Sequence, residues 1–127
     1  VFQDENGRVQ PFEDEYSMDL WHFNGALSMV NDGAEDNNGS RFCFVQSSSV
    51  NADMLLEMKN IGFPSNVILK YAGVGGAPWL DTKQVVFAQV YDGLDVLDAI
   101  AAVKVDENGV PKENVVINSM SVEKYQG

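Results

Sequence analysis

Apolar residues along the chain fall in short runs separated by polar, glycine-rich segments. GALSMV (25–30) alternates small and apolar residues and predicts a short strand, and the compact run RFCFVQ (41–46) predicts a buried strand. KQVVFAQV (83–90) predicts another strand. After a turn at DENG (106–109), VVINSMSVEKY (115–125) alternates as a final strand with one face buried.

Three other stretches have helical spacing: ADMLLEMK (52–59), PSNVILKYAG (64–73) and DGLDVLDAIAAV (92–103). The last of these places four apolar residues on one stripe: Leu94, Leu97, Ile100 and Ala101. The first two have residues suited to their ends. For the first helix the candidate N-caps are Asn51 and Asp53, with Gly62 beyond its end; for the second they are Ser65 and Asn66, with Gly73 as the stop.

Composition narrows the class of protein. The 127 residues suit one domain spanning 1–127, and 45% hydrophobic residues are enough for a core. The formal charge of −11, from 19 acidic and 8 basic residues, repels phosphate backbones and anionic lipid, so nucleic acid and membrane partners are not expected. Acidity that simply keeps the protein soluble is the plainer interpretation. The compartment stays open, with the cytoplasm favoured and export or the cell surface the alternative if an N-terminal segment is missing.

Several kinds of chemical site fit the sequence poorly. The acidic stretches NDGAEDNNG and DENGVPKE lack the spacing of a calcium loop, and GVGGAP (73–78) lacks the Lys-Ser/Thr of a phosphate loop. His22 and Cys43 are the single histidine and the single cysteine, so a zinc site would need carboxylates for its other ligands. One histidine also gives little basis for a nucleophile, base and orienting acid.

Four stretches, in order along the chain, carry a family pattern: FEDEY (12–16), NGALSMVNDG (24–33), NNGSRFCFVQ (37–46) and PWLDTKQVVFAQVYDGLDVLDAI (78–100). The set resembles the second half of a cyclophilin, whose pattern reads F-E-D-E, G-x-L-S-M-A-N, N-x-N-G-S-Q-F-F and W-L-D-G-x-H-V-V-F-G. The segment from about 51 to 77 is similar to an insertion found in cyclophilins of some Gram-positive gut bacteria.

The resemblance implies a mainly β fold, a partial cyclophilin-like antiparallel barrel with a capping helix at about 93–103 and a two-helix insertion at about 52–73. It implies peptidyl-prolyl cis-trans isomerase activity that assists protein folding, with proline-containing peptides or unfolded proteins as partners and no cofactor or metal. Rotation about an X-Pro bond faces a barrier of about 18–20 kcal/mol and takes tens to hundreds of seconds uncatalysed.

The resemblance also implies a peptide-binding site. The stretch Val-Asn-Asp stands where the family has Ala-Asn-Ala, and Trp-Leu matches the pair that flanks the proline pocket. The pair Asn-Gly matches the loop that borders the neighbouring pocket. The residues concerned are Val30, Asn31, Asp32, Asn38, Gly39, Trp79 and Leu80. Ordinary core packing explains Trp79 and Leu80 equally well.

Three positions of that site depart from the family. Arg41 replaces a glutamine, Cys43 replaces the second of two phenylalanines, and Gln84 replaces the pocket histidine. The family's catalytic arginine lies upstream of F-E-D-E, in a segment without a counterpart here. Arg41 is a candidate substitute for its guanidinium, although a solvated charge at a strand end is the plainer interpretation. The expected isomerase activity of this chain is therefore weak.

Two alternatives to an enzyme remain open. One is a module that binds proline-containing peptides without turnover, and the other is a structural fragment that assembles into an oligomer. A partial barrel leaves strand edges and an apolar face uncovered, which favours pairing with another chain. We therefore expect a homo-oligomer or a complementing chain.

Overall fold

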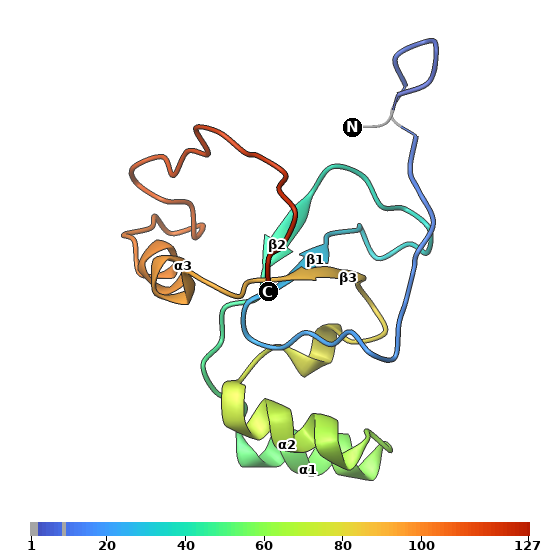
Figure 1. Ribbon diagram of the computed structural model, residues 1–127, viewed down its shortest axis with the longest axis vertical. Helices are drawn as coiled ribbons and strands as arrows, with labels where there is room; N and C mark the ends of the chain where they lie inside the picture. Colours follow the sequence, from blue (N-terminus) through green and yellow to red (C-terminus); the bar gives the residue numbers. More distant parts are fainter. Residues whose placement is uncertain (1–2, 9) are drawn as a thin grey trace.

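The structure, a computed structural model, describes residues 3–8 and 10–127 and centres on a three-stranded antiparallel sheet (Figure 1). Two helices lie together below the sheet and a third lies to one side, while the N-terminal segment runs along the opposite side. The elements in chain order are β1 (Ala26–Met29), β2 (Phe42–Phe44), α1 (Ala52–Asn60), α2 (Ser65–Val74), the 3₁₀ helix η1 (Pro78–Leu80), β3 (Val86–Gln89) and α3 (Leu94–Ala101).

Strand β1 occupies the middle of the sheet, in the order β2-β1-β3. Leu27 pairs with Phe44 on one side and with Ala88 on the other, and a bulge interrupts the β1–β3 register between Leu27 and Ser28. Because side chains alternate along a strand, Ala26 and Ser28 share the buried face. This strand therefore carries both a core residue and a polar residue that is sealed from solvent.

Two apolar clusters hold the described residues together. Ala26, Val45, Ala77 and Val86 form the first, beneath the sheet, with Leu80 packed against it. The second forms between α1, α2 and the segment before β1 and is centred on Met58, Val67 and Tyr71; Trp21, Phe23, Val50, Met54, Leu55, Phe63 and Ile68 pack around these three. The two-helix insertion thus builds a core of its own against residues 21–23.

The helix predictions are confirmed in position and partly in their ends. Asn51 caps α1, and its side chain accepts a hydrogen bond from the Met54 N–H at 2.8 Å. The predicted caps of α2 are wrong, because Pro64 precedes the first turn and no side-chain cap is present there. Gly73 lies inside α2, and the helix ends at Gly75, whose φ of 79° suits glycine.

One strand prediction is wrong, and another is confirmed as a strand but not as a fully buried one. Residues 115–125 form no strand, and their apolar side chains are exposed; Val122 is 103% exposed and Ile117 63%. The run 41–46 does form β2, but Phe42 and Phe44 are 39% and 44% exposed, so only part of it is buried. Among the described residues, no neighbouring strand supplies backbone partners to this final segment. An alternating sequence pattern cannot by itself provide such a partner.

The prediction of a mainly β fold also needs correction. In the described residues the three helices have 9, 10 and 8 residues, whereas the three strands have 4, 3 and 4. The secondary-structure content is therefore mixed. The three-stranded sheet is open, so the barrel is at most partial. The third predicted helix is shorter than expected and none of its residues is buried. None of the helices in residues 3–8 and 10–127 is long and apolar enough to cross a membrane.

Candidate functional site

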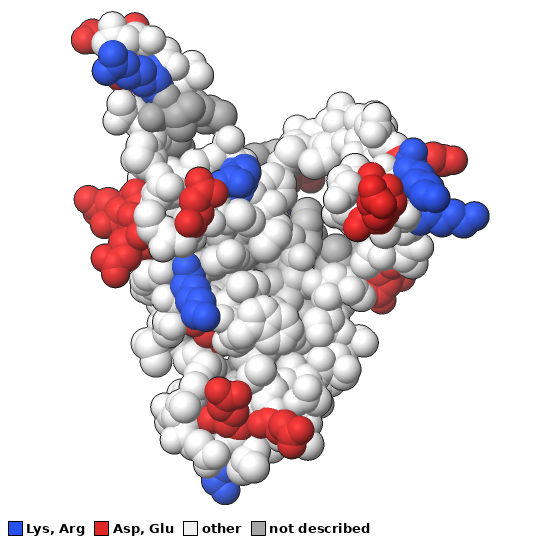
Figure 2. Space-filling model, turned by 180° about the vertical axis from the view of Figure 1, so that it is seen from behind, with Lys and Arg blue, Asp and Glu red and all other residues white. Residues whose placement is uncertain are grey.

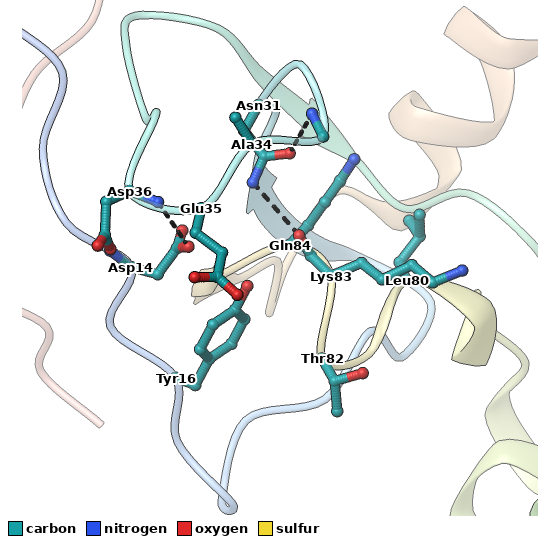
Figure 3. Close-up of a pocket in the computed structure, with 11 residues that line it drawn as sticks. Asp14, Tyr16, Asn31, Ala34, Glu35, Asp36, Leu80, Thr82, Lys83 and Gln84 are labelled. Atoms are coloured by element: carbon teal, nitrogen blue, oxygen red, sulfur yellow. Dashed lines mark hydrogen bonds between the residues drawn. The ribbon is translucent and has the colours of Figure 1, made fainter.

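Three segments distant in sequence surround a hollow of about 720 Å³ (Figure 3). The N-terminal segment contributes Asp14 and Tyr16, the loop after β1 contributes Asn31 and residues 33–36, and η1 with the loop that follows it contributes Leu80 and residues 82–84. In the close-up, Glu35 and Tyr16 extend toward one another between these loops. The hollow therefore depends on tertiary contacts among loops rather than on one element.

Asn31 ties two of these segments together. Its side-chain amide donates to the Lys83 carbonyl at 3.3 Å, and its side-chain oxygen accepts from the Gly33 N–H at 3.1 Å. Gly33 has a φ of 84°, a left-handed conformation that glycine adopts without strain. The loop after β1 is thereby turned back toward the loop that precedes β3.

The N-terminal segment is fixed to the same loop by paired carboxylates. The Asp14 N–H donates to the Asp36 carboxylate at 2.8 Å, and the Asp36 N–H donates to that of Asp14 at 3.0 Å. The buried side chain of Asn38 donates to Asp14 at 2.7 Å and to the Phe12 carbonyl at 3.0 Å. The Asp36 N–H, followed by Asn38, lowers the pKa of the Asp14 carboxyl below its ordinary value.

The rim of the hollow is acidic, with Asp14, Glu35 and Asp36 facing a single cation, Lys83, among its lining residues. Burial raises the pKa of the Tyr16 phenol, and the charge of Asp14 raises it further. On the face turned away in Figure 1, charged side chains lie toward the edges and leave an uncharged middle (Figure 2). The acidic lining favours ligands that carry positive charge.

A buried cluster surrounds the single histidine and reaches the hollow through Gln84, one of its lining residues. His22 Nδ1 lies 2.7 Å from Asp81 Oδ1, and Nε2 lies 2.7 Å from the Ser28 hydroxyl oxygen. Serine, histidine and aspartate in this order are the groups that hydrolases use for nucleophilic catalysis. Ser28 is 0% exposed and His22 1%, so no substrate reaches the hydroxyl, and the cluster is not a nucleophilic site.

Comparison with known proteins identifies the family. The model of the family described as "Cyclophilin type peptidyl-prolyl cis-trans isomerase/CLD" matches residues 2–122. This chain belongs to the cyclophilin-type peptidyl-prolyl cis-trans isomerases. A relative from Staphylococcus saprophyticus is 41% identical over 113 residues, and one from Staphylococcus aureus is 42% identical over 113 residues. Both are named "Putative peptidyl-prolyl cis-trans isomerase"; each match covers 89% of this chain and 57% of the relative.

Three of the positions that match the cyclophilin pattern lie around the hollow. Asn31 lines it from the loop after β1, and Leu80 and Gln84 line it from η1 and the loop that follows η1. Leu80 also packs against the first apolar cluster, which fixes its position in the lining of the hollow. Gln84 additionally borders a second hollow of about 420 Å³, between residues 16–22 and 61–64.

Other matched positions are not among the residues that line the hollow. Trp79 is 52% exposed on η1, and Cys43 is partly buried on β2, where burial raises the pKa of its thiol. Asn38 is fully buried and joins two loops, as described above, and Gly39 follows it at the surface of the same loop in a half-buried position. The expected grouping of Trp79, Leu80, Cys43 and Asn31 therefore does not appear among the lining residues of this hollow.

Arg41 is engaged in an exposed ion pair with Asp32, whose side chains are 63% and 67% exposed respectively. The Arg41 carbonyl accepts the Val30 N–H at 3.0 Å, which holds the two ends of this loop together. Neither charged side chain is among the lining residues of the hollow. In this position Arg41 acts as a surface charge balanced by its neighbour.

Sequence reasoning did not find the carboxylates of the rim or the buried cluster. Asp14, Glu35 and Asp36 occur in polar stretches that look like ordinary loops, and only the fold brings them to one hollow. His22 was available as a signal because it is the single histidine. Its partners Ser28 and Asp81 are 6 and 59 residues away, and no periodicity relates them.

Proposed function

We propose that this chain forms part of a peptidyl-prolyl cis-trans isomerase that rotates X-Pro bonds in peptides and unfolded proteins, and thereby assists folding. The observation that carries the proposal is the convergence of Asn31, Leu80 and Gln84, three family-pattern positions, on one hollow of about 720 Å³. The family match over residues 2–122 supports the same reaction.

In this proposal the hollow binds the peptide around its proline. Leu80 offers an apolar contact to the proline ring, while the backbone at Asn31 and the amide of Gln84 offer polar contacts to the peptide chain. The reaction needs no covalent intermediate, because only rotation about a bond of partial double-bond character is required. Groups that stabilise the twisted amide better than the planar one lower the barrier.

We expect the rate enhancement of this chain by itself to be small. Gln84 replaces a histidine, Cys43 replaces an aromatic ring, and the guanidinium of Arg41 is already paired with Asp32. A guanidinium directed at the reacting amide is an electrostatic group that is typically worth about 10²–10³ in rate. Binding of proline-containing peptides without turnover is the second candidate function. The hollow is present in this chain, whereas the side chains expected to accelerate the rotation differ from those of the family pattern.

The test is exchange NMR on a proline-containing peptide carrying a basic flanking residue, with the chain present in catalytic amounts. Exchange separates binding from turnover, since resonances of Asn31 and Gln84 report the first and cis–trans cross-peaks report the second. Gln84→Ala should weaken binding, and Gln126→Ala, at an exposed position, serves as the matched control.

The outcomes divide the candidates. Peptide-induced shifts around Asn31 with accelerated exchange support the isomerase, and shifts without acceleration identify a binding module. Near-normal family activity that Arg41→Ala abolishes would assign the guanidinium role to Arg41, despite its pairing with Asp32. The proposal is contradicted if the peptide shifts the resonances of none of the lining residues.

A further inference from the structure

Five side chains form a continuous run of hydrogen bonds from the helical insertion to the hollow: Tyr71, Asp81, His22, Ser28 and Gln84. The Tyr71 hydroxyl donates to Asp81 Oδ2 at 2.6 Å, and the run ends where Ser28 Oγ lies 3.4 Å from Gln84 Oε1. The first four are at most 7% exposed, so water does not compete for these contacts.

The proton positions at the inner end of this run follow from its chemistry. Asp81 Oδ1 accepts the His22 backbone N–H at 3.0 Å and faces Nδ1 of the same residue, while Oδ2 accepts from Tyr71. Burial, followed by the hydrogen bond to Asp81, raises the pKa of the Tyr71 phenol, so this group remains a donor. A carboxylate surrounded by donors fixes a proton on His22 Nδ1.

The outer end of the run has two consistent arrangements, because Ser28 has one proton to donate. If His22 Nε2 is bare, it accepts from Ser28, and Gln84 must then turn its NH₂ toward the serine oxygen. If Nε2 carries a proton, it donates to Ser28, and Ser28 donates to the Gln84 carbonyl oxygen. The two arrangements differ by a half-turn of the Gln84 amide, whose oxygen and nitrogen have nearly the same shape.

We propose that Tyr71, Asp81, His22 and Ser28 position Gln84, and that the proton on His22 Nε2 determines which end of its amide faces the hollow. A bare Nε2 leaves the Gln84 carbonyl oxygen for a peptide N–H, whereas a protonated Nε2 leaves the NH₂ for a peptide carbonyl. Among the described residues, Asp81 and Tyr71 are the titratable groups hydrogen-bonded to His22 or to its carboxylate partner. Tyr71 belongs to α2, so the insertion becomes a determinant of the peptide site.

The consequence for peptide binding rests on the proposed function, but the positioning itself is tested without any peptide. In isotope-labelled protein, the Gln84 side-chain NH₂ resonances and the His22 ring nitrogens are followed by NMR in Tyr71→Phe and Ser28→Ala. Both substitutions should shift the Gln84 resonances. Tyr91→Phe, at a residue 79% exposed, is the matched control and should leave them unchanged. Unchanged Gln84 resonances in both folded variants overturn the proposal.

The unsubstituted protein supplies a second, independent measurement should a variant fail to fold. The ring nitrogens of His22 report whether Nε2 carries a proton, and contacts from the Gln84 NH₂ protons report which end of the amide faces Ser28. The proposal requires a bare Nε2 with NH₂ toward Ser28, or a protonated Nε2 with oxygen toward Ser28. Either crossed combination contradicts it.

Peptide binding then separates this inference from the proposed function. Ser28→Ala should weaken binding of the proline-containing peptide by about threefold to tenfold, the worth of one hydrogen bond, because the Gln84 amide loses its orientation. If the Gln84 resonances shift in the variants but no peptide binds, the positioning of Gln84 is supported and the proposed isomerase function is contradicted. Peptide binding that Ser28→Ala leaves unchanged would show that the orientation of Gln84 has no part in recognition.

Discussion

Asp14 illustrates how much a single side chain gains from its neighbours. In the sequence it is one of three acidic residues in FEDEY, and nothing there distinguishes it from Glu13 or Glu15. In the structure its carboxylate accepts hydrogen bonds from the Asp36 N–H and from Asn38, and these contacts join the N-terminal segment to the loop after β1. The charged form is therefore favoured by the fold.

This stabilisation predicts a pH dependence. The pKa of Asp14 is lowered in the folded state, so the carboxylate contributes stability that is present above the unfolded pKa of about 3.9 and lost as the pH falls through the folded value. Asp14→Asn should be less stable than the parent chain near neutral pH, and the difference should shrink in acid. Urea unfolding at a series of pH values measures it, and a difference independent of pH would contradict the prediction.

At the scale of elements, the second helix ends two residues later than its sequence indicates. Gly73 is exposed inside α2 with ordinary helical backbone and open space around it, whereas Gly75 lies in the left-handed region at its end. A Cβ on Gly75 would overlap the Ser47 carbonyl oxygen. Two glycines that look alike in the sequence thus have opposite requirements.

Substitution of each glycine by alanine tests this assignment. Gly73→Ala should raise the free energy of unfolding by about 0.5–1 kcal/mol, because alanine is the better helix former. Gly75→Ala should lower it by about 2 kcal/mol or more through backbone strain and the clash with Ser47. Thermal or urea unfolding decides the signs, and a stabilising Gly75→Ala would show that α2 ends elsewhere.

The helix caps give a second prediction at this scale. Asn51 accepts the Met54 N–H, while Asn66, a candidate cap in the sequence, lies inside the first turn of α2. Asn51→Ala should cost about 1 kcal/mol of stability. The matched Asn66→Ala should cost nothing or stabilise slightly, since alanine suits a helix interior better. Equal losses in urea unfolding would contradict the cap assignment.

At the scale of the whole molecule, one face of the sheet carries exposed aromatic rings. Phe42, Phe44 and Phe87 are 39%, 44% and 49% exposed, and the rings of Phe42 and Phe87 lie 6.4 Å apart in an edge-on arrangement. The chain spans 57% of the length of the Staphylococcus relatives described above. Such a surface favours burial against a second copy or a complementing segment.

We therefore expect this chain by itself to associate. Sedimentation velocity at micromolar concentration should show a dimer or larger species, because burial of aromatic rings removes apolar surface from water. Phe44→Ser combined with Phe87→Ser should shift the population toward monomer. Tyr91→Ser, which removes an exposed aromatic ring elsewhere, is the control and should have little effect. A stable monomer of the parent chain would contradict the expectation.

The sequence by itself determined the features that depend on local order. The spacing of apolar residues located β1, β3 and all three helices to within a few residues, because helix and strand periodicities are local. The ordered motifs FEDEY, NGALSMVNDG and PWLDTKQVVF were enough for the family, which the match over residues 2–122 confirms. Length and net charge restricted the class of protein but predicted no contact between residues.

Only the tertiary structure decided which residues meet. Alternation at 115–125 looks like a strand, yet a strand exists only where a neighbour supplies backbone partners, and that segment has none among the described residues. Burial of β2, the place of Trp79 outside the hollow and the chain from Tyr71 to Gln84 likewise depend on segments far apart in sequence. Local pattern favours one type of element, but the packing of distant segments decides whether that element forms and whether a side chain is buried, paired or exposed.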